Sequence, residues 1–147
     1  GKILIGGIKT LSNFSSVDII ICSHTIEHVY NPTELVEKFY NKLNKGGRLM
    51  LSCPNSESHV LNNLKEKWRG LEAPRHISIP TKKIIEHHLK KIGFKKVVFY
   101  DCFYVTNSET NNPKFIVKIF KRFLFNLKRK PKILAKYSDF IQLVAYK

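Results

Sequence analysis

Acidic residues, cysteines and long apolar runs are all scarce in this chain of 147 residues. Only 11 Asp and Glu residues stand against 26 Lys and Arg residues. The three cysteines, Cys22, Cys53 and Cys102, are too far apart to suggest a disulfide framework, and this usage predicts a reducing, cytoplasmic environment. No apolar run reaches the roughly 18 residues of a membrane-spanning helix. No secretory signal is expected, because the chain opens on Gly-Lys and a strand-like segment.

The positive charge is concentrated towards the C-terminus. Residues 111–147 hold ten basic residues and one acidic residue, Asp139. Apolar residues recur at helical spacing within residues 114–132, which predicts a basic amphipathic helix that can lie on an anionic membrane. A helix packed on the domain with its lysines in solvent is the alternative. Nucleic acid is the least favoured partner, because the stretch lacks a recognised motif and an aromatic platform.

Strand-like and helix-like segments alternate along the chain. Residues 17–22 form a continuous apolar run, which is typical of a strand buried on both faces of a parallel sheet. Further strands are expected at residues 2–6, 48–53, 94–104 and 140–146. The alternation predicts an α/β domain with a mainly parallel sheet.

Helix signals are clear at three places. Asn31 is a natural N-cap followed by Pro32, and this helix is expected to end at Gly46-Gly47. A second helix is expected over residues 57–68. The third is expected to begin at the cap Thr81 and to end at Gly93, and its inward side chains are predicted to be Ile84, Ile85, Leu89 and Ile92.

Polar residues follow two of the expected strands. Residues 23–28 read Ser-His-Thr-Ile-Glu-His, and Pro54-Asn55-Ser56 follows the next strand. Ligands of open α/β sheets bind at the carboxyl ends of the strands. Because histidine titrates near neutrality, either His24 or His28 is a candidate general base. The alternative is that Glu27 and His28 only bond to local backbone at the entry to a helix.

The same residues spell His-x-x-Glu-His, the signature of inverted zinc peptidases. That chemistry needs both histidines on one face of a sustained helix and a third ligand elsewhere. Barely two helical turns of chain separate the strand ending at Cys22 from the helix starting at Asn31. No metal site is therefore predicted.

A second polar cluster extends from Trp68 to His76. Arg75 can bind a carboxylate or phosphate with two hydrogen bonds, and Trp68 offers a flat surface for a ring or sugar. Loops on a rigid scaffold commonly select the substrate. Trp68, Arg75 and His76 are therefore candidate substrate-binding residues. The alternative is that Trp68 closes the core and that the charged groups are solvated.

Two stretches together resemble the second half of class I S-adenosylmethionine-dependent methyltransferases. They are VDIIICSHTIEHVYNPTELVEKFYNKLNKGGRLMLSCPN and WRGLEAPRHISIPTKKIIEHHLKKIGFKKVVFY. The likeness rests on the apolar strand, Glu27-His28, Gly46-Gly47 before the next strand and Pro74-Arg75-His76 before a capped helix. It is closer to the subgroup that acts on sugar, lipid-linked or quinone-like acceptors.

The resemblance implies a Rossmann-like sheet with an antiparallel last strand and S-adenosylmethionine as cofactor. Residues 111–136 become a basic insertion between the last two strands of one partial domain. Cys22, Ser23 and His24 would flank the cofactor, while Glu27 and His28 would face the acceptor. His28, with His24 second, is the expected base; Arg75 is the expected acceptor anchor, and His76 would shape the pocket.

The chain departs from the family in its N-terminal part. It has no Gly-x-Gly-x-Gly loop, and no acidic residue stands where the family binds the ribose, so the first two strand–helix units are predicted to be missing. Their absence would leave an apolar strand edge. Either residues 2–6 pair with it, or a second copy or another chain covers it, or the sequence is a fragment of a longer chain. Weak or no cofactor binding by this chain alone is therefore expected. The rival hypothesis is a non-catalytic remnant that binds an anionic membrane or a partner through residues 114–132.

Overall fold

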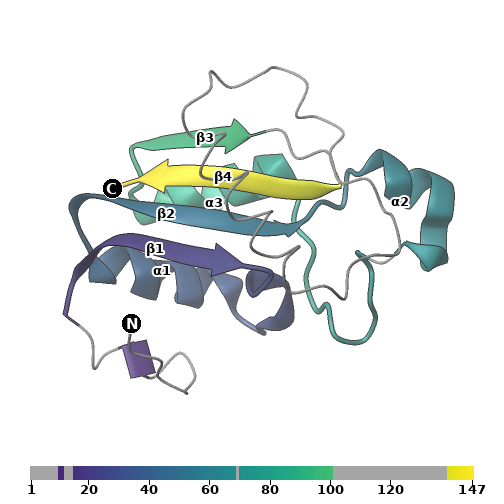
Figure 1. Cartoon of the computed structure of the whole chain (residues 1–147), viewed down its shortest axis with the longest axis horizontal. Coiled ribbons are helices and arrows are strands. Elements are labelled where there is room, and N and C mark those ends of the chain that lie inside the picture. Colours follow the sequence, from purple (N-terminus) through teal and green to yellow (C-terminus); the bar gives the residue numbers. More distant parts are fainter. Residues whose placement is uncertain (1–9, 12–14, 69, 101–138) are drawn as a thin grey trace, which may run out of the picture.

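Four strands form one mixed sheet in the order β1-β2-β4-β3 (Figure 1). The computed structural model describes residues 10–11, 15–68, 70–100 and 139–147. β1 and β2 are parallel, whereas β4 runs antiparallel to both of its neighbours, β2 and β3. The strands are β1 (Val17–Ser23), β2 (Leu43–Pro54), β3 (Lys96–Tyr100) and β4 (Phe140–Tyr146). The α/β class, the antiparallel last strand and its pairing with the strand before it are confirmed.

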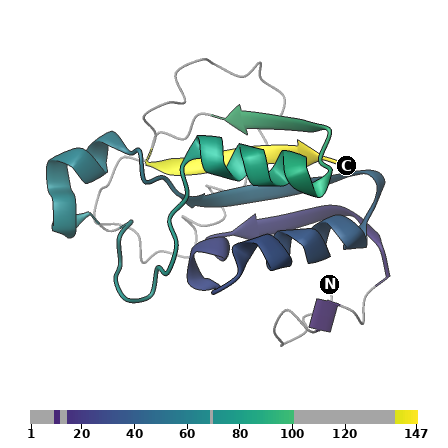
Figure 2. The same cartoon turned by 180° about the vertical axis from the view of Figure 1, so that it is seen from behind.

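Two helices, α1 (Pro32–Lys42) and α3 (Lys82–Ile92), cover one face of this sheet, as Figure 2 shows from behind. Both predicted N-caps are confirmed. The side chain of Asn31 accepts a hydrogen bond from the Glu34 amide at 3.1 Å, and Thr81 does the same for the Ile84 amide at 3.1 Å. Each cap satisfies an amide that the helix itself cannot. The caps therefore fix where both helices begin.

The main core lies between these helices and the sheet. Apolar residues of β2 and β4 that point towards the helices are fully buried, Leu49, Leu51 and Leu143 among them. Burying a leucine side chain contributes about 1.5–3 kcal/mol. From α1 and α3, the side chains of Phe39 and Leu89 pack into the same cluster. This packing holds the carboxyl ends of β1 and β2 side by side.

The end of α1 differs from the prediction. The helix stops at Lys42, before Gly46-Gly47, and β2 already begins at Leu43. Leu43 is buried and pairs with Val17 of β1, so the chain is already in the sheet before it reaches the glycines. The glycines are used instead at the irregular start of β2, where Gly46 has a φ of +81°. That conformation suits glycine because it has no Cβ.

Lys147 caps the C-terminal end of α1 from the far end of the chain. Its Nζ donates hydrogen bonds to the carbonyl oxygens of Tyr40 at 2.7 Å and Leu43 at 2.8 Å. Helix C-terminal carbonyls lack partners within the helix, and a cation there also opposes the helix dipole. This long-range cap replaces the glycine cap that the sequence predicted.

Two further expectations need correction. The helix predicted over residues 57–68 is a short α2 (His59–Leu64) followed by the 3-10 turn η3 (Lys65–Lys67). Ile84 is exposed on α3, whereas Ile85 and Leu89 are buried as predicted. Ile84 lies in the first turn of α3, at the rim of an apolar groove between α1 and α3, so it is not enclosed.

β1 is an edge strand of the described sheet, and the side chains on one of its faces are uncovered, so the predicted burial of residues 17–22 on both faces is wrong. Ile19 is 53% exposed, and Val17 and Ile21 are also exposed. The expected strand at residues 2–6 and the basic insertion at 111–136, with its helix at 114–132, lie outside the described residues. Among the described helices, none has the length and apolar character that crossing a bilayer requires.

Candidate functional site

The candidate site begins where β1 ends. His24 follows Ser23, and its amide donates to the carbonyl of Ser52 on β2 at 2.9 Å, so the two carboxyl ends stay joined as the chain turns away. His24 has a φ of +48°, in the left-handed region. For a residue with a side chain this costs about 1–3 kcal/mol, and such strain is concentrated at functional sites.

The turn continues into the 3-10 helix η2 (Ile26–His28), which carries a buried carboxylate. The side chain of Glu27 is 0% exposed, and its Oε1 accepts a hydrogen bond from Nδ1 of His24 at 3.1 Å. His24 itself is 44% exposed, with its ring against the edge of Phe140. A buried carboxylate thus orients a solvent-accessible imidazole.

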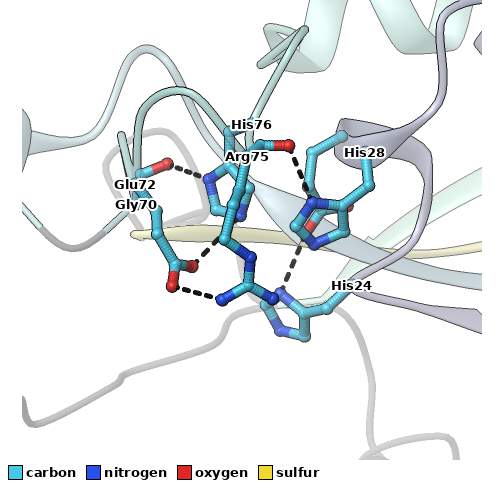
Figure 3. Close-up of polar contacts among 7 residues, drawn as sticks. His24, His28, Gly70, Glu72, Arg75 and His76 are labelled. Carbon is cyan, nitrogen blue, oxygen red and sulfur yellow. Dashed lines mark hydrogen bonds and ion pairs between the residues drawn. The ribbon is translucent and has the colours of Figure 1, made fainter.

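The loop before α3 folds back onto η2. The backbone carbonyl of Glu27 accepts from the Ile77 amide at 2.7 Å, and Nδ1 of His28 lies 2.9 Å from the carbonyl oxygen of Arg75. The rings of His28 and His76 are 4.7 Å apart between centroids (Figure 3). Residues 47 or more positions apart in sequence therefore form one cluster, which joins the polar turn predicted at residues 23–28 to the polar loop predicted from Trp68 to His76.

Glu72 organises the loop side of the site, a role that the sequence analysis missed. Its carboxylate pairs with Arg75 at 2.7 Å and lies 3.5 Å from Nε2 of His76 (Figure 3). The signal was present as Glu-x-x-Arg-His, since these spacings bring side chains together in a helical turn. Arg75 remains 69% exposed, so its guanidinium can still meet a ligand from solvent.

The hydrogen bonds fix the tautomers of three histidines. A carbonyl oxygen can only accept, so Nδ1 of His28 donates to Arg75, and Nδ1 of His76 donates to Gly70 at 2.6 Å. The Glu27 carboxylate likewise accepts from His24. In neutral imidazole the other nitrogen then carries the lone pair. Each histidine therefore offers Nε2 as a base or as a metal ligand.

Besides Glu27, which was predicted to face the acceptor, two predicted site residues are buried. The Cys22 thiol packs in the main core, and burial raises its pKa to about 11, opposed by a hydrogen bond with Thr25 and helped by the nearby charge of Glu27. Trp68 is 3% exposed, and a Cβ on Gly70 would lie 2.2 Å from its ring. Cys22 can therefore contact a ligand only through its backbone. The Trp68 ring packs against Gly70 and supports the loop.

A second buried polar group closes the neighbouring strand end. Oγ of Ser58 donates to the carboxylate of Asp139 at 2.7 Å, and the amide of Asn55 donates to the Asp139 carbonyl at 3.0 Å. These bonds tie the carboxyl end of β2 to the start of β4. Asp139 is the single acidic residue within residues 111–147. Its isolation among basic residues is the feature of the sequence that could have identified it as a structural residue.

Known proteins match both the sequence and the fold. The family model of a methyltransferase domain matches residues 9–98. A tRNA U34 carboxymethyltransferase of Wolinella succinogenes is 29% identical over 92 residues, which make up 62% of this chain and 33% of that protein. The chain therefore spans about a third of the length of this curated relative.

Solved structures agree on the fold. A SAM-dependent methyltransferase from Archaeoglobus fulgidus has a TM-score of 0.58 and 19% identity, covering 95% of this chain and 64% of that one. The plantazolicin methyltransferase BamL, in complex with a triazolic desmethylPZN analogue and SAH, has a TM-score of 0.56 and 13% identity, covering 97% and 58%. At these identities the two structures support the fold alone.

Proposed function

Because this chain belongs to the methyltransferase domain family, we propose that it forms the acceptor side of a methyl-transfer centre. The acceptor in this proposal is a small molecule, a sugar or a lipid-linked compound. S-adenosylmethionine is the cofactor that accompanies this family. When bound, it supplies the electrophilic methyl group. The chain's own residues must then orient the acceptor and take up a proton where the acceptor loses one.

One observation carries the assignment of roles. The hydrogen bond from Nδ1 of His28 to the Arg75 carbonyl, 2.9 Å long, joins the proposed base to the proposed acceptor anchor. It leaves the Nε2 lone pair of His28 available to take a proton from the acceptor. The exposed Arg75 guanidinium can hold an anionic group of the same molecule. His24 is the second candidate base.

The residues at the end of β1 fit the cofactor in part. Ser23 and His24 are exposed there, so they can border its methionine portion, whereas Cys22 contributes only backbone. The sequence lacks a Gly-x-Gly-x-Gly loop, and the chain spans only part of its relatives. Binding by this chain is therefore proposed to be weak, with a dissociation constant on the order of 1 mM, which corresponds to about −4 kcal/mol.

Isothermal titration with S-adenosylhomocysteine tests the proposal. We expect weak but saturable binding that falls further in His24→Ala and is unchanged in His87→Ala, an exposed control on α3. Circular dichroism establishes that each variant is folded. An absence of heat at ligand concentrations well above the millimolar range, from a folded chain, would contradict the cofactor role of the residues that end β1.

The rival membrane hypothesis rests on residues 114–132, outside the described part of the chain. Family membership favours methyl transfer over it. We also propose that copies of the chain associate at the edge strand β1, on which Ile19 is exposed. In sedimentation velocity, Ile19→Thr should reduce any dimer, because it removes apolar surface while keeping a β-branched side chain. A dimer fraction unaffected by this change would rule out the edge as the contact.

A further inference from the structure

The site holds a second constellation that the proposed base and anchor do not explain. Glu27, His28 and His76 each direct one potential ligand atom inward, and these atoms all lie within 4.8 Å of one another. Two of the residues come from η2 and the third from the loop before α3 (Figure 3). The 2.7 Å hydrogen bond from the Ile77 amide to the Glu27 carbonyl holds the two segments together.

Both imidazoles are oriented as metal ligands are. Histidines that bind metals generally donate their second ring N–H to a carbonyl or carboxylate, which fixes the ring and raises its basicity. Here Nδ1 of His28 donates to the Arg75 carbonyl and Nδ1 of His76 to the Gly70 carbonyl. Nε2 of each ring is left without a backbone carbonyl, and one nitrogen of each ring lies within 4.8 Å of the other two ligand atoms. Nε2 of His76 also lies 3.5 Å from the Glu72 carboxylate, a separation that is long for a hydrogen bond.

The carboxylate gives an independent indication of a cation. Glu27 is fully buried, and in the part of the chain that the structure describes its Oε2 has no hydrogen-bond partner. An ionised oxygen in that position is costly unless a positive group meets it. His24 is bound to the other oxygen, Oε1, and is half exposed, so it leaves Oε2 unsatisfied.

We propose that Glu27, His28 and His76 bind one divalent transition-metal ion, such as Zn²⁺, Mn²⁺ or Co²⁺. Two imidazole nitrogens with one carboxylate suit these ions, whereas Mg²⁺ prefers oxygen ligands. Zinc ligands lie about 2.0–2.2 Å from the ion, which places them about 3.4 Å from each other in a tetrahedral site. Because the three ligand atoms lie within 4.8 Å of one another, side-chain rotations of about 1 Å bring them to these separations. The motif His24-x-x-Glu27-His28 contributes its last two residues, and the third ligand comes from the loop instead of the same helix.

A metal held by three side chains keeps a coordination position for another oxygen. If the methyl acceptor is a hydroxyl compound, that position selects it and makes its proton easier to lose. Nε2 of His28 is then occupied, and the role of base passes to His24. This step rests on the proposed function; metal binding itself does not.

The test uses the full chain, freed of metal by a chelator and titrated with Zn²⁺, Co²⁺, Mn²⁺ and Mg²⁺ in turn. We expect one Zn²⁺ per chain, a rise in melting temperature, and a visible Co²⁺ spectrum with nitrogen ligands. Glu27→Gln and His76→Ala should each lose roughly 100-fold in Zn²⁺ affinity, with His87→Ala as the matched control for surface histidine binding. Equal affinity in wild type and both site variants would overturn the proposal. So would a response to Mg²⁺ that exceeds the response to Zn²⁺.

A measurement on unaltered protein guards against variants that do not fold. Zn²⁺ should shift the ¹⁵N resonances of Nε2 in His28 and His76, while both Nδ1 resonances keep the signature of a protonated nitrogen. Shifts confined to His87 and His88 would overturn the site. Titration with S-adenosylhomocysteine is run separately. If the chain binds zinc but not S-adenosylhomocysteine, only the proposed cofactor role is refuted. If it binds S-adenosylhomocysteine but not zinc, only the metal site is refuted.

Discussion

Replacement of Glu27 by methionine should make the metal-free protein more stable. The carboxylate is fully buried and its Oε2 is without a partner among the described residues, which costs about 1–3 kcal/mol. Methionine fills nearly the same volume without a charge. The change also removes the hydrogen bond to His24, worth about 1 kcal/mol, but His24 is 44% exposed and can bond to water instead. The expected net gain in the free energy of unfolding is about 1–2 kcal/mol.

Urea unfolding in the presence of a chelator measures this gain. Trp68 is the single tryptophan and is buried, so its fluorescence reports the transition, with circular dichroism as a second probe. The melting temperature should rise by about 2–4 °C per kcal/mol. Glu37→Met, at an exposed position on α1, is the matched control and should change stability by less than about 0.5 kcal/mol.

Zinc should reverse the order of stability. Wild type gains free energy from binding the ion in its folded state, whereas Glu27→Met has lost a ligand and gains much less. If the variant is equally stable or less stable than wild type in the chelated sample, Oε2 is already satisfied in the native protein. The reasoning that links the unpaired oxygen to a cation would then be refuted, whatever zinc does.

Three further predictions follow from single contacts. Because burial raises the pKa of the Cys22 thiol from 9.0 to about 11, the unfolded chain loses that proton first as the pH rises. The free energy of unfolding should therefore fall by about 3 kcal/mol from pH 9 to beyond pH 11, and by less in Cys22→Ala, as urea titrations across that range would measure. Asn31→Ala should cost about 1 kcal/mol by thermal melting, since the Glu34 amide loses its cap, and no change would refute the cap. Ser58→Ala should cost about 1–3 kcal/mol in urea unfolding by leaving the buried Asp139 carboxylate short of a partner, whereas Ser58→Thr should recover part of that loss.

Local signals in the sequence were sufficient for most element boundaries. A polar cap followed by periodic apolar residues predicted the starts of α1 and α3, and β4 was predicted at its observed bounds. The end of α1 was predicted wrongly, because its cap comes from Lys147, more than a hundred residues away. Local patterns carry no information about such a contact. The same limit applies to Trp68, whose burial depends on the close approach of Gly70.

The candidate site shows a similar division between local and long-range information. His24, Glu27 and His28 were identified because functional residues gather where buried strands end. The spacing of the His-x-x-Glu-His motif argues against a metal site, because a single helix cannot present its ligands there. That argument concerned one segment, and the third ligand, His76, reaches the cluster only when the loop docks on η2. A buried glutamate whose Oε2 meets no partner among the described residues is an arrangement that folding alone does not favour. Proteins keep such arrangements mainly at functional sites, so the instability predicted for Glu27 and the ion proposed beside it are two consequences of one arrangement.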